Sequence, residues 1–401
     1  MRFASPLMPL HRIAFDEALS RQQREGAHRP NAATGHPSEA SAPIEYLAFG
    51  PVDAAGEATC PVIAAFESTE LEYAAIRRGA ALFDESWRGT IEVTGADRID
   101  LLNRLVTQDL RPIKEGGVVR AFLTNRKGRI DADLVIAETG TRTLLDLVVH
   151  DAATVASIIE KFVFAETATV RDVTASLHAL SLHGPRATEV LQALGLEAPA
   201  PNAMTCSALL GGTTVIALPS LGELGYSIRV PYGSAGALWN ALREQSSVRC
   251  AGWHAYNIAR VENGEPMFRI DFGPTNLPHE TGVLPSRVSF TKGCYPGQEV
   301  VARMQHLGKP KQMLVGLRVQ GDALPMGEAM VFSRNDDGTT GEHVGAVTSS
   351  SVAPMLSAAS VAFAMLRSAQ TTEGTEVFVE CEGAMLPARV QSLRFFGGGG
   401  R

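Results

Sequence analysis

The order of hydrophobic and polar positions predicts a mixture of strands and helices from about residue 70 onwards. Alternating apolar and polar residues predict strands at four places in the first part of the chain, 90–94, 118–123, 132–137 and 143–149. Apolar residues at helical spacing predict helices over 70–78, 99–105 and 154–162. Gly79 is well placed to end the first helix, and Asp97 is placed to cap the second. Strands interleaved with helices in this order indicate an α+β layer.

A similar unit recurs further along the chain. Strands are predicted over 176–181, 214–218 and 226–230, and helices over 185–194 and 235–244. The repeated order predicts two related α+β units, over about 67–175 and 176–309, which together form the region 67–309.

The pattern of predicted secondary structure changes at both ends of this region. After residue 310, short strands alternate with Gly, Pro and Asp turns, at 313–319, 329–332, 344–349, 361–366, 376–381 and 388–395. This pattern predicts a small β-barrel over 310–396, followed by a flexible glycine-rich tail over 397–401. Residues 1–66 show weak periodicity, and their richness in Ala, Pro, Gly, Ser and Glu predicts an irregular lead-in.

Composition narrows the classes of function. A chain of 401 residues with a net charge of -7 is not expected to bind nucleic acid directly or to adhere to anionic membranes. No apolar run reaches the roughly 18 residues of a membrane-spanning helix, and the first thirty residues lack a secretory hydrophobic core. Five widely spaced cysteines without a C-x-x-C pair indicate a reducing compartment, the cytoplasm or, in a eukaryote, the mitochondrial matrix. The histidines form no H-x-x-x-H pair, so no metal site is expected.

The densest chemical signal is the segment 290–303, which contains a cysteine in a tight turn. Gly293, Pro296 and Gly297 permit a turn that ordinary residues resist, and Glu299 falls in the first turn of a short predicted helix. A thiol at Cys294, before a helix and close to Lys292, could be shifted toward thiolate and serve as a nucleophile, a redox centre or a transient metal ligand. The alternative is a small buried cysteine in a structural turn.

This segment resembles the K-G-C-Y-x-G-Q-E signature of the YgfZ family, folate-binding paralogues of the glycine-cleavage T-protein. The matching residues are Lys292, Gly293, Cys294, Tyr295, Gly297, Gln298 and Glu299. The resemblance implies a role in the assembly or repair of iron–sulfur enzymes, including enzymes that modify tRNA. Iron–sulfur enzymes or assembly factors would then be protein partners, with Cys294 carrying a redox or cluster-related step.

The resemblance extends over about residues 67–395. Gly79 to Ser86 resembles the "vGlfDlS" segment of the T-protein family, Leu182 to Ala187 its "lqGP.A" turn, and Gly345 to Ser349 its "G.vTS" element. The implied fold is two folate-binding α+β units and a small C-terminal β-barrel. The implied ligand is tetrahydrofolate or a one-carbon derivative of it.

The resemblance also suggests residues that contact folate. Gly222 to Tyr226 matches a "GE.Gy" stretch whose glutamate, here Glu223, recognises the pterin ring; the alternative is a solvated turn residue. Arg260 matches the arginine of "R.EaG", which lies near the folate; its alternative is an ion pair on a helix surface.

The third candidate is Asp133, where the sequence departs from the family. T-proteins carry two adjacent aspartates in "GGi.DDl", but here Ala132 replaces the first while Asp133 retains the second. If Ala132 holds the catalytic position, ordinary aminomethyl transfer is lost, because a methyl group cannot accept a proton. We therefore expect a tetrahydrofolate-binding, YgfZ-type protein that supports iron–sulfur enzymes. The alternatives are a tetrahydrofolate-dependent aminomethyltransferase or demethylase, and a plain folate-binding or docking module whose cysteine is structural.

Overall fold

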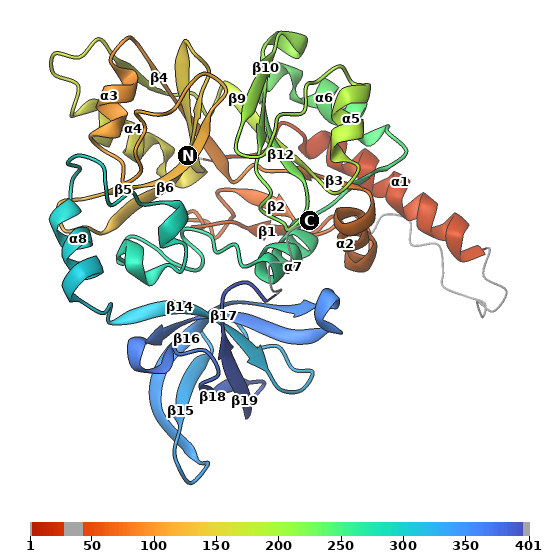
Figure 1. The fold of residues 1–401 in the computed structure, drawn as a ribbon. Coiled ribbons are helices and arrows are strands. Elements are labelled where there is room, and N and C mark those ends of the chain that lie inside the picture. Colours follow the sequence, from red (N-terminus) through yellow and green to blue (C-terminus); the bar gives the residue numbers. More distant parts are fainter. Residues whose placement is uncertain (1, 28–42, 396–401) are drawn as a thin grey trace.

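The computed structural model describes residues 2–27 and 43–395, and it contains two α+β units above a β-barrel (Figure 1). The first unit is built on a five-stranded antiparallel sheet in the order β5-β6-β7-β4-β8. Its strands are β4 (Arg88–Thr94), β5 (Val118–Thr124), β6 (Ile130–Glu138), β7 (Arg142–Val148) and β8 (Thr169–Asp172). Helices α3 (Arg98–Asn103) and α4 (Ala152–Glu160) cover one face of it, burying Leu101 and Val155 against Leu134 and Leu145.

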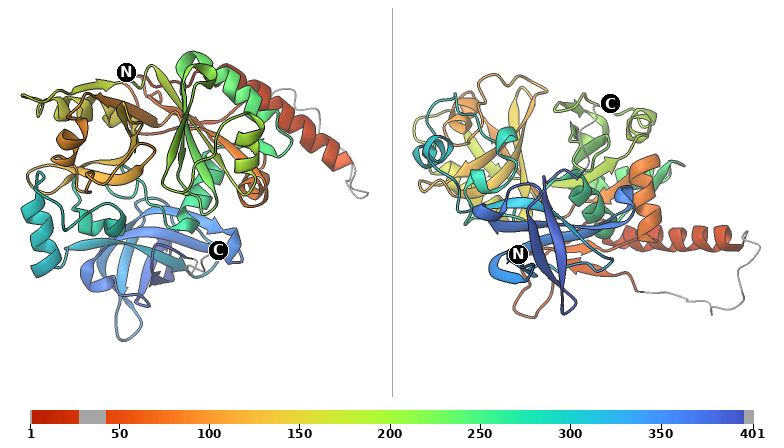
Figure 2. Two further views of the ribbon diagram at one scale, coloured as in Figure 1. Left: turned by 45° about the horizontal axis from the view of Figure 1, so that its top comes forward. Right: turned by 60° about the horizontal axis from the view of Figure 1, so that its bottom comes forward.

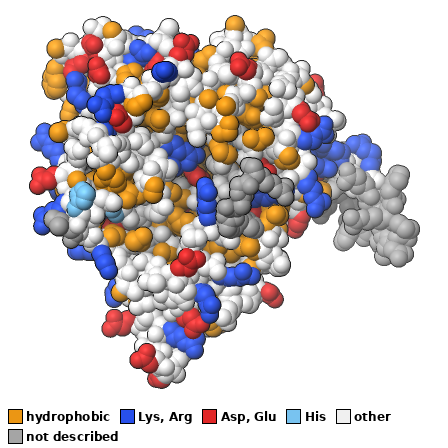
Figure 3. Space-filling view, in the orientation of Figure 1, with side chains coloured by type: hydrophobic (Ala, Val, Ile, Leu, Met, Phe, Trp, Pro, Cys, Tyr) orange, Lys and Arg blue, Asp and Glu red, His pale blue; other side chains and the backbone are white. Residues whose placement is uncertain are grey.

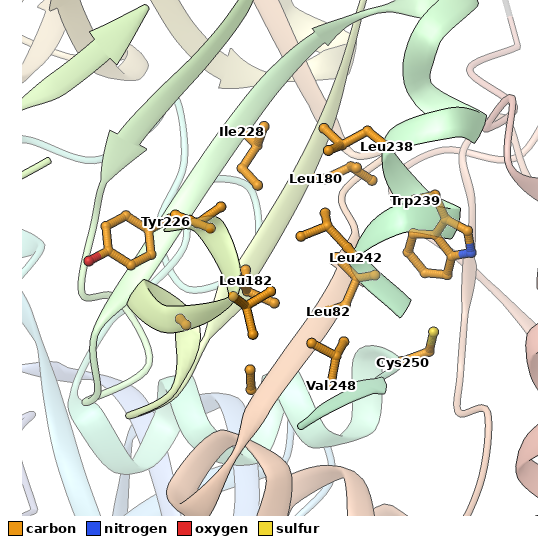
Figure 4. Close-up of a cluster of buried hydrophobic side chains, with 14 of the residues drawn as sticks. Leu82, Leu180, Leu182, Tyr226, Ile228, Leu238, Trp239, Leu242, Val248 and Cys250 are labelled. Carbon is orange, nitrogen blue, oxygen red and sulfur yellow. The ribbon is translucent and has the colours of Figure 1, made fainter. Parts of the chain in front are cut away.

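The second unit is built on a six-stranded sheet in the order β10-β11-β12-β9-β3-β13. Its strands are β3 (Ala80–Asp84), β9 (Leu177–His183), β10 (Met204–Ser207), β11 (Thr213–Ala217), β12 (Gly225–Pro231) and β13 (Val248–Cys250), with helices α5 (Ala187–Ala193) and α6 (Ala235–Arg243). Leu180 and Ile228 from the sheet share one buried cluster with Leu242 and Trp239 of α6, and Trp239 is fully buried (Figure 4).

The two units repeat one chain order, which confirms the expected recurrence. Each runs strand, helix, three strands, helix, strand, so that β4 to β8 correspond to β9 to β13. The difference is β3, which lies between β9 and β13 and pairs with both, although it precedes the first unit in the chain. The turn over 85–88 therefore carries the chain from the second sheet into β4 of the first.

The irregular lead-in expected for residues 1–66 is wrong for most of its described part. Residues Met8–Ala27 form helix α1, and β1 (Tyr46–Ala48) pairs with β2 (Pro61–Ile63). Leu7, directly before α1, and Ala14 and Ala18 on its core face are buried, but the same face carries the buried His11, whose ring contacts Asp84. A polar residue and alanines on the core face hide the apolar periodicity that normally reveals a helix. Residues 28–42 of the lead-in and the expected tail lie outside the described residues.

Helices α2 (Thr69–Arg78), α7 (Trp253–Asn263) and α8 (Gln298–Leu307) connect these parts. α2 ends at Gly79, as predicted. Asp97 stands at the start of α3, but its carboxylate accepts a hydrogen bond from the backbone N–H of Thr167 (2.7 Å) instead of capping the helix.

The C-terminal domain is a closed barrel, as predicted, in the order β14-β17-β16-β15-β18-β19. Its strands are β14 (Gln312–Val319), β15 (Met330–Arg334), β16 (Thr340–Ala353), β17 (Ala359–Arg367), β18 (Glu376–Cys381) and β19 (Ala384–Gln391). The barrel lies below both units in Figure 1 and in the left view of Figure 2, and acidic and basic side chains are interspersed on its face in Figure 3. Across residues 2–27 and 43–395, no helix has the length and apolar character needed to cross a membrane.

Candidate functional site

A cavity of about 90 Å³ lies between the two α+β units. We call it the central cavity. Its walls come from β4, β5, β6 and β7 of the first sheet, from β9 and β12 of the second, and from α7 and the loops after it. The volume is roughly six times what a single water molecule needs by the same measure, so the space admits a ring-sized group.

One side of the central cavity is a chain of alternating charges. Arg287 donates from Nε to Asp133 (3.1 Å) and from Nη2 to Glu265 (3.4 Å), and Arg120 also pairs with Glu265. Burial alone would raise the pKa of Glu265, but the two guanidinium groups outweigh burial and hold this pKa below its usual range. Asp133, the candidate taken from the sequence, is therefore on the cavity wall and is compensated by a buried arginine.

A second charged group surrounds Asp146 of β7. Its carboxylate pairs with both Arg88 and Arg229. Burial lowers the pKa of Arg229 to about 9, and the guanidinium also donates to the hydroxyl of Ser227 (2.8 Å). Asp146 is thus also a compensated carboxylate.

The remaining wall is also polar, but its side chains make fewer ion pairs and hydrogen bonds than the two charged groups described above. Glu85 lines the cavity at the turn between the sheets and is 5% exposed. Its carboxylate accepts a hydrogen bond from Ser227 at 3.5 Å, and no ion pair involving Glu85 occurs within the described part of the chain. Two other cavity-lining groups, Ser181 Oγ and His183 Nδ1, are buried without a hydrogen-bond partner among the described residues. Because burial lowers the pKa of His183 to about 3, its ring is neutral at physiological pH.

The structure separates Ala132 from Asp133. Ala132 is buried in the apolar core of the first unit, on the side of β6 that faces away from the central cavity. Asp133 faces the cavity, and Asp131 accepts a hydrogen bond from the Asn125 amide (2.9 Å). The alanine therefore removes no carboxylate from the cavity wall, and Asp133 is the acid that β6 supplies there.

The other two candidate folate contacts do not line the central cavity. The side chain of Glu223 is 35% exposed, and its carboxylate lies 3.9 Å from Nη1 of Arg77. Arg260 is buried, but it pairs with Asp271 (2.7 Å) and donates to the hydroxyl of Ser349 on the barrel (2.6 Å). The ion-pair alternative for Arg260 thus describes its contacts, although the pair is buried and not on a helix surface.

The cysteine loop, residues 292–297, lies against the first unit and also outside the cavity lining. The ammonium group of Lys292 donates to three backbone carbonyls, those of Asn103 (2.6 Å), Val106 (2.6 Å) and Gln108 (2.9 Å). Cys294 is exposed, so the alternative of a small buried cysteine does not describe it. Glu299 lies in the first turn of α8, as predicted.

Several cavity residues escaped the sequence analysis, namely Glu85, Arg88, Arg120, Asp146, Ser181, Glu265 and Arg287. The signal available for Arg120 and Asp146 was a charged residue inside an otherwise apolar strand, which is costly unless it is paired or used. Among the described residues, no group of three or more His, Cys, Asp or Glu side chains could hold a metal ion.

Comparison with known proteins places this geometry in a family. Residues 29–292 match the GCVT N-terminal domain, and residues 312–396 match the glycine cleavage T-protein C-terminal barrel domain. An aminomethyltransferase of Moorella thermoacetica is 28% identical over 338 residues, covering 81% of this chain and 88% of that protein. An aminomethyltransferase of Symbiobacterium thermophilum is 29% identical over 352 residues, covering 82% and 90%.

A solved structure shows the same fold over nearly the whole chain. The glycine cleavage system aminomethyltransferase T of Bartonella henselae superimposes with a TM-score of 0.81 at 24% identity, covering 98% of both chains. Because the first domain match alone spans well over half of the sequence, the chain belongs to the glycine cleavage T-protein family.

Proposed function

We propose that this protein binds tetrahydrofolate, or a one-carbon derivative of it, in the central cavity. The observation that carries the proposal is the wall of buried polar groups, Glu85, Ser181 and His183, which keep hydrogen-bonding capacity that the described residues do not use. Buried polar groups without partners are costly, and a bound ligand would supply the missing hydrogen bonds. Membership in the T-protein family supports the choice of ligand.

The cavity residues suit a reduced pterin. Carboxylates accept hydrogen bonds from the amino group and the ring N–H of such a molecule. The acids that already pair with arginines keep the cavity walls rigid and the net charge of the cavity low. The bound folate would supply the nitrogen atoms that carry a one-carbon unit. The protein side chains would orient the ring and exclude water from it.

Isothermal titration with tetrahydrofolate tests this function. We expect micromolar-class binding by the wild-type chain and a loss of about tenfold in Asp133→Asn, because Arg287 then loses its charged partner on the cavity wall. Glu376→Gln, at an exposed ion pair of the barrel, is the matched control and should bind like the wild type. Absence of binding by the wild-type chain at several hundred micromolar ligand would exclude the proposal.

For the reaction, the comparisons favour aminomethyl transfer over the iron–sulfur role. The curated relatives that we compared are aminomethyltransferases. In addition, Ala132 faces the core while Asp133 supplies a carboxylate to the cavity, so the substitution does not by itself remove an acid from the proposed site.

One observation favours the second candidate, a YgfZ-type role in maintaining iron–sulfur enzymes. Cys294 is exposed on a loop that Lys292 fixes to the first unit through three carbonyls. We expect Cys294→Ala to fold and bind folate, yet to fail to restore iron–sulfur enzyme activity in cells lacking the native protein. Cys206→Ala, at the other exposed cysteine outside the cavity, is the matched control and should complement. Full complementation by Cys294→Ala would leave its thiol a structural role only.

A further inference from the structure

The outer surface of the barrel carries apolar side chains across three neighbouring strands, β15, β18 and β19. Inward residues of these strands, such as Val331 and Val379, fill the barrel core, so the residues that alternate with them point outward. Apolar residues that are partly or largely exposed occupy several of these outward positions, namely Met330, Phe332, Phe378, Met385 and Pro387. We call this set the barrel strip.

The register of the strands brings the barrel strip into two adjacent rows. One row consists of the two phenylalanines and Pro387, which lie opposite one another across the three strands. The other row contains the two methionines, with Glu380 of β18 between them. Rows on one face of a strand are two residues apart, about 7 Å, so the apolar side chains of the two rows form one continuous patch.

The described part of the chain leaves this patch open. Helix α7 contacts β16 and β17, and Figure 1 shows β15, β18 and β19 on the part of the barrel furthest from the α+β units. Met330 and Met385 are 45% and 38% exposed. Contiguous apolar patches on a protein surface, particularly those with a polar rim, commonly mark sites of protein–protein interaction.

The charges around the barrel strip indicate the chemistry of its partner. Arg334 and Arg389, at one end of the strip, both pair with Glu376. Other carboxylates on the same strands, or in the turns next to them, make no ion pair among the described residues, namely Glu328, Asp336, Asp337, Glu380 and Glu382. The rim of the strip is therefore net acidic, which favours a basic partner and disfavours an anionic one.

We propose that the barrel strip binds a basic amphipathic helix of another protein. Neighbouring strands lie about 4.8 Å apart, so the strip extends about 10 Å across the three strands. Apolar side chains at positions i, i+4 and i+7 of a helix span a similar length at about 1.5 Å per residue. Lysines and arginines beside those positions would meet the unpaired carboxylates of the rim. Exposed methionines suit such a contact because their side chains adapt to the shape of an apolar partner.

Fluorescence anisotropy with a labelled synthetic helix tests this inference on the full chain. The probe has about 18 residues, with leucine on one face and lysine on the other. We expect micromolar-class binding by the wild type, and binding at least about tenfold weaker in the double variant Met330→Ser/Met385→Ser. Met355→Ser, at an exposed methionine outside the strip, is the matched control and should bind like the wild type. Thermal unfolding confirms that each variant is folded.

Two further measurements separate charge from apolar contact. A probe with glutamate in place of lysine should bind the wild type at least about tenfold more weakly. The double variant Glu380→Gln/Glu382→Gln removes two carboxylates of the rim and should weaken binding of the lysine probe at least about fivefold. Glu160→Gln/Glu197→Gln, at exposed positions of the α+β units, removes the same charge elsewhere and should bind like the wild type.

Equal binding of the two probes by the wild type would overturn the inference. It would also be overturned if the methionine and glutamate double variants of the strip bound the lysine probe like the wild type. Sedimentation velocity distinguishes a second copy of the chain as the occupant, and we expect the wild type to sediment as a monomer. A wild-type dimer that Met330→Ser/Met385→Ser converts to a monomer would assign the strip to self-association and exclude the helix partner. None of these outcomes depends on the ligand of the central cavity.

Discussion

His183 carries a neutral, buried imidazole on the cavity side of β9, and this makes folding stability depend on pH. Burial lowers its pKa to about 3, whereas a histidine in an unfolded chain titrates near 6.5. Between these values the unfolded chain binds a proton that the folded chain does not. The contribution of this residue is therefore fully present above about pH 6.5 and is lost as the pH falls toward 3.

We expect His183→Gln to flatten the dependence of unfolding free energy on pH. Proton linkage with these pKa values costs the wild type about 2 kcal/mol between pH 7.5 and pH 5, and the variant lacks this term. Urea unfolding at the two pH values measures the difference. His343→Gln, at an exposed position of β16, should keep the wild-type slope. An equally steep loss of stability in His183→Gln would show that other groups cause the acid sensitivity.

The residues of the site were predictable to different degrees. Asp133 was named as a candidate because its sequence segment resembles a family motif, and its side chain lines the central cavity. Glu85 lies in another resembling segment, Gly79 to Ser86, yet nothing local distinguishes it from a solvated turn residue. Its burial arises only because β3 joins the second sheet while β4 joins the first, a pairing between segments about 100 residues apart.

At the level of helices and strands, elements with a strong local pattern were predicted, whereas elements that depend on contacts with distant segments were missed. The barrel strands and helices α2 and α6 show strong periodicity and clear turns, and they were predicted within a few residues of their observed bounds. Strand β3 was missed because it is buried on both sides, so the alternation that reveals a half-buried strand is absent. Helix α1 was missed because its core face contains alanines and a histidine, and Asp84 on β3 holds that histidine.

For the whole molecule, Asp271 is one of the carboxylates that join the α+β units to the barrel. Asp271 accepts hydrogen bonds from Arg260 of α7 (2.7 Å), from Ser349 (2.6 Å) and Thr348 (2.9 Å) of β16, and from the backbone N–H of Met267 (2.8 Å). Arg260 and Asp271 are both almost fully buried. Two segments that resemble family motifs, around Arg260 and around Ser349, therefore meet at this acid, and their contact fixes the barrel beneath the units.

Asp271→Asn should loosen the barrel before the α+β units unfold. The variant leaves the charge of Arg260 buried without a carboxylate, which costs about 3–5 kcal/mol, and the loss falls on the contact between α7 and β16. The three tryptophans, Trp87, Trp239 and Trp253, all precede the barrel, so their fluorescence reports on the units. In this variant we expect trypsin to cleave within 312–391 at a lower urea concentration than the midpoint of the fluorescence transition. In the wild type, cleavage and the fluorescence transition should occur at the same urea concentration.

Arg334→Ala is the control, because it removes an exposed ion pair within the barrel, and it should keep cleavage and the fluorescence transition at the same urea concentration. Coincident transitions in Asp271→Asn would mean that apolar packing, not this buried ion pair, holds the barrel in place.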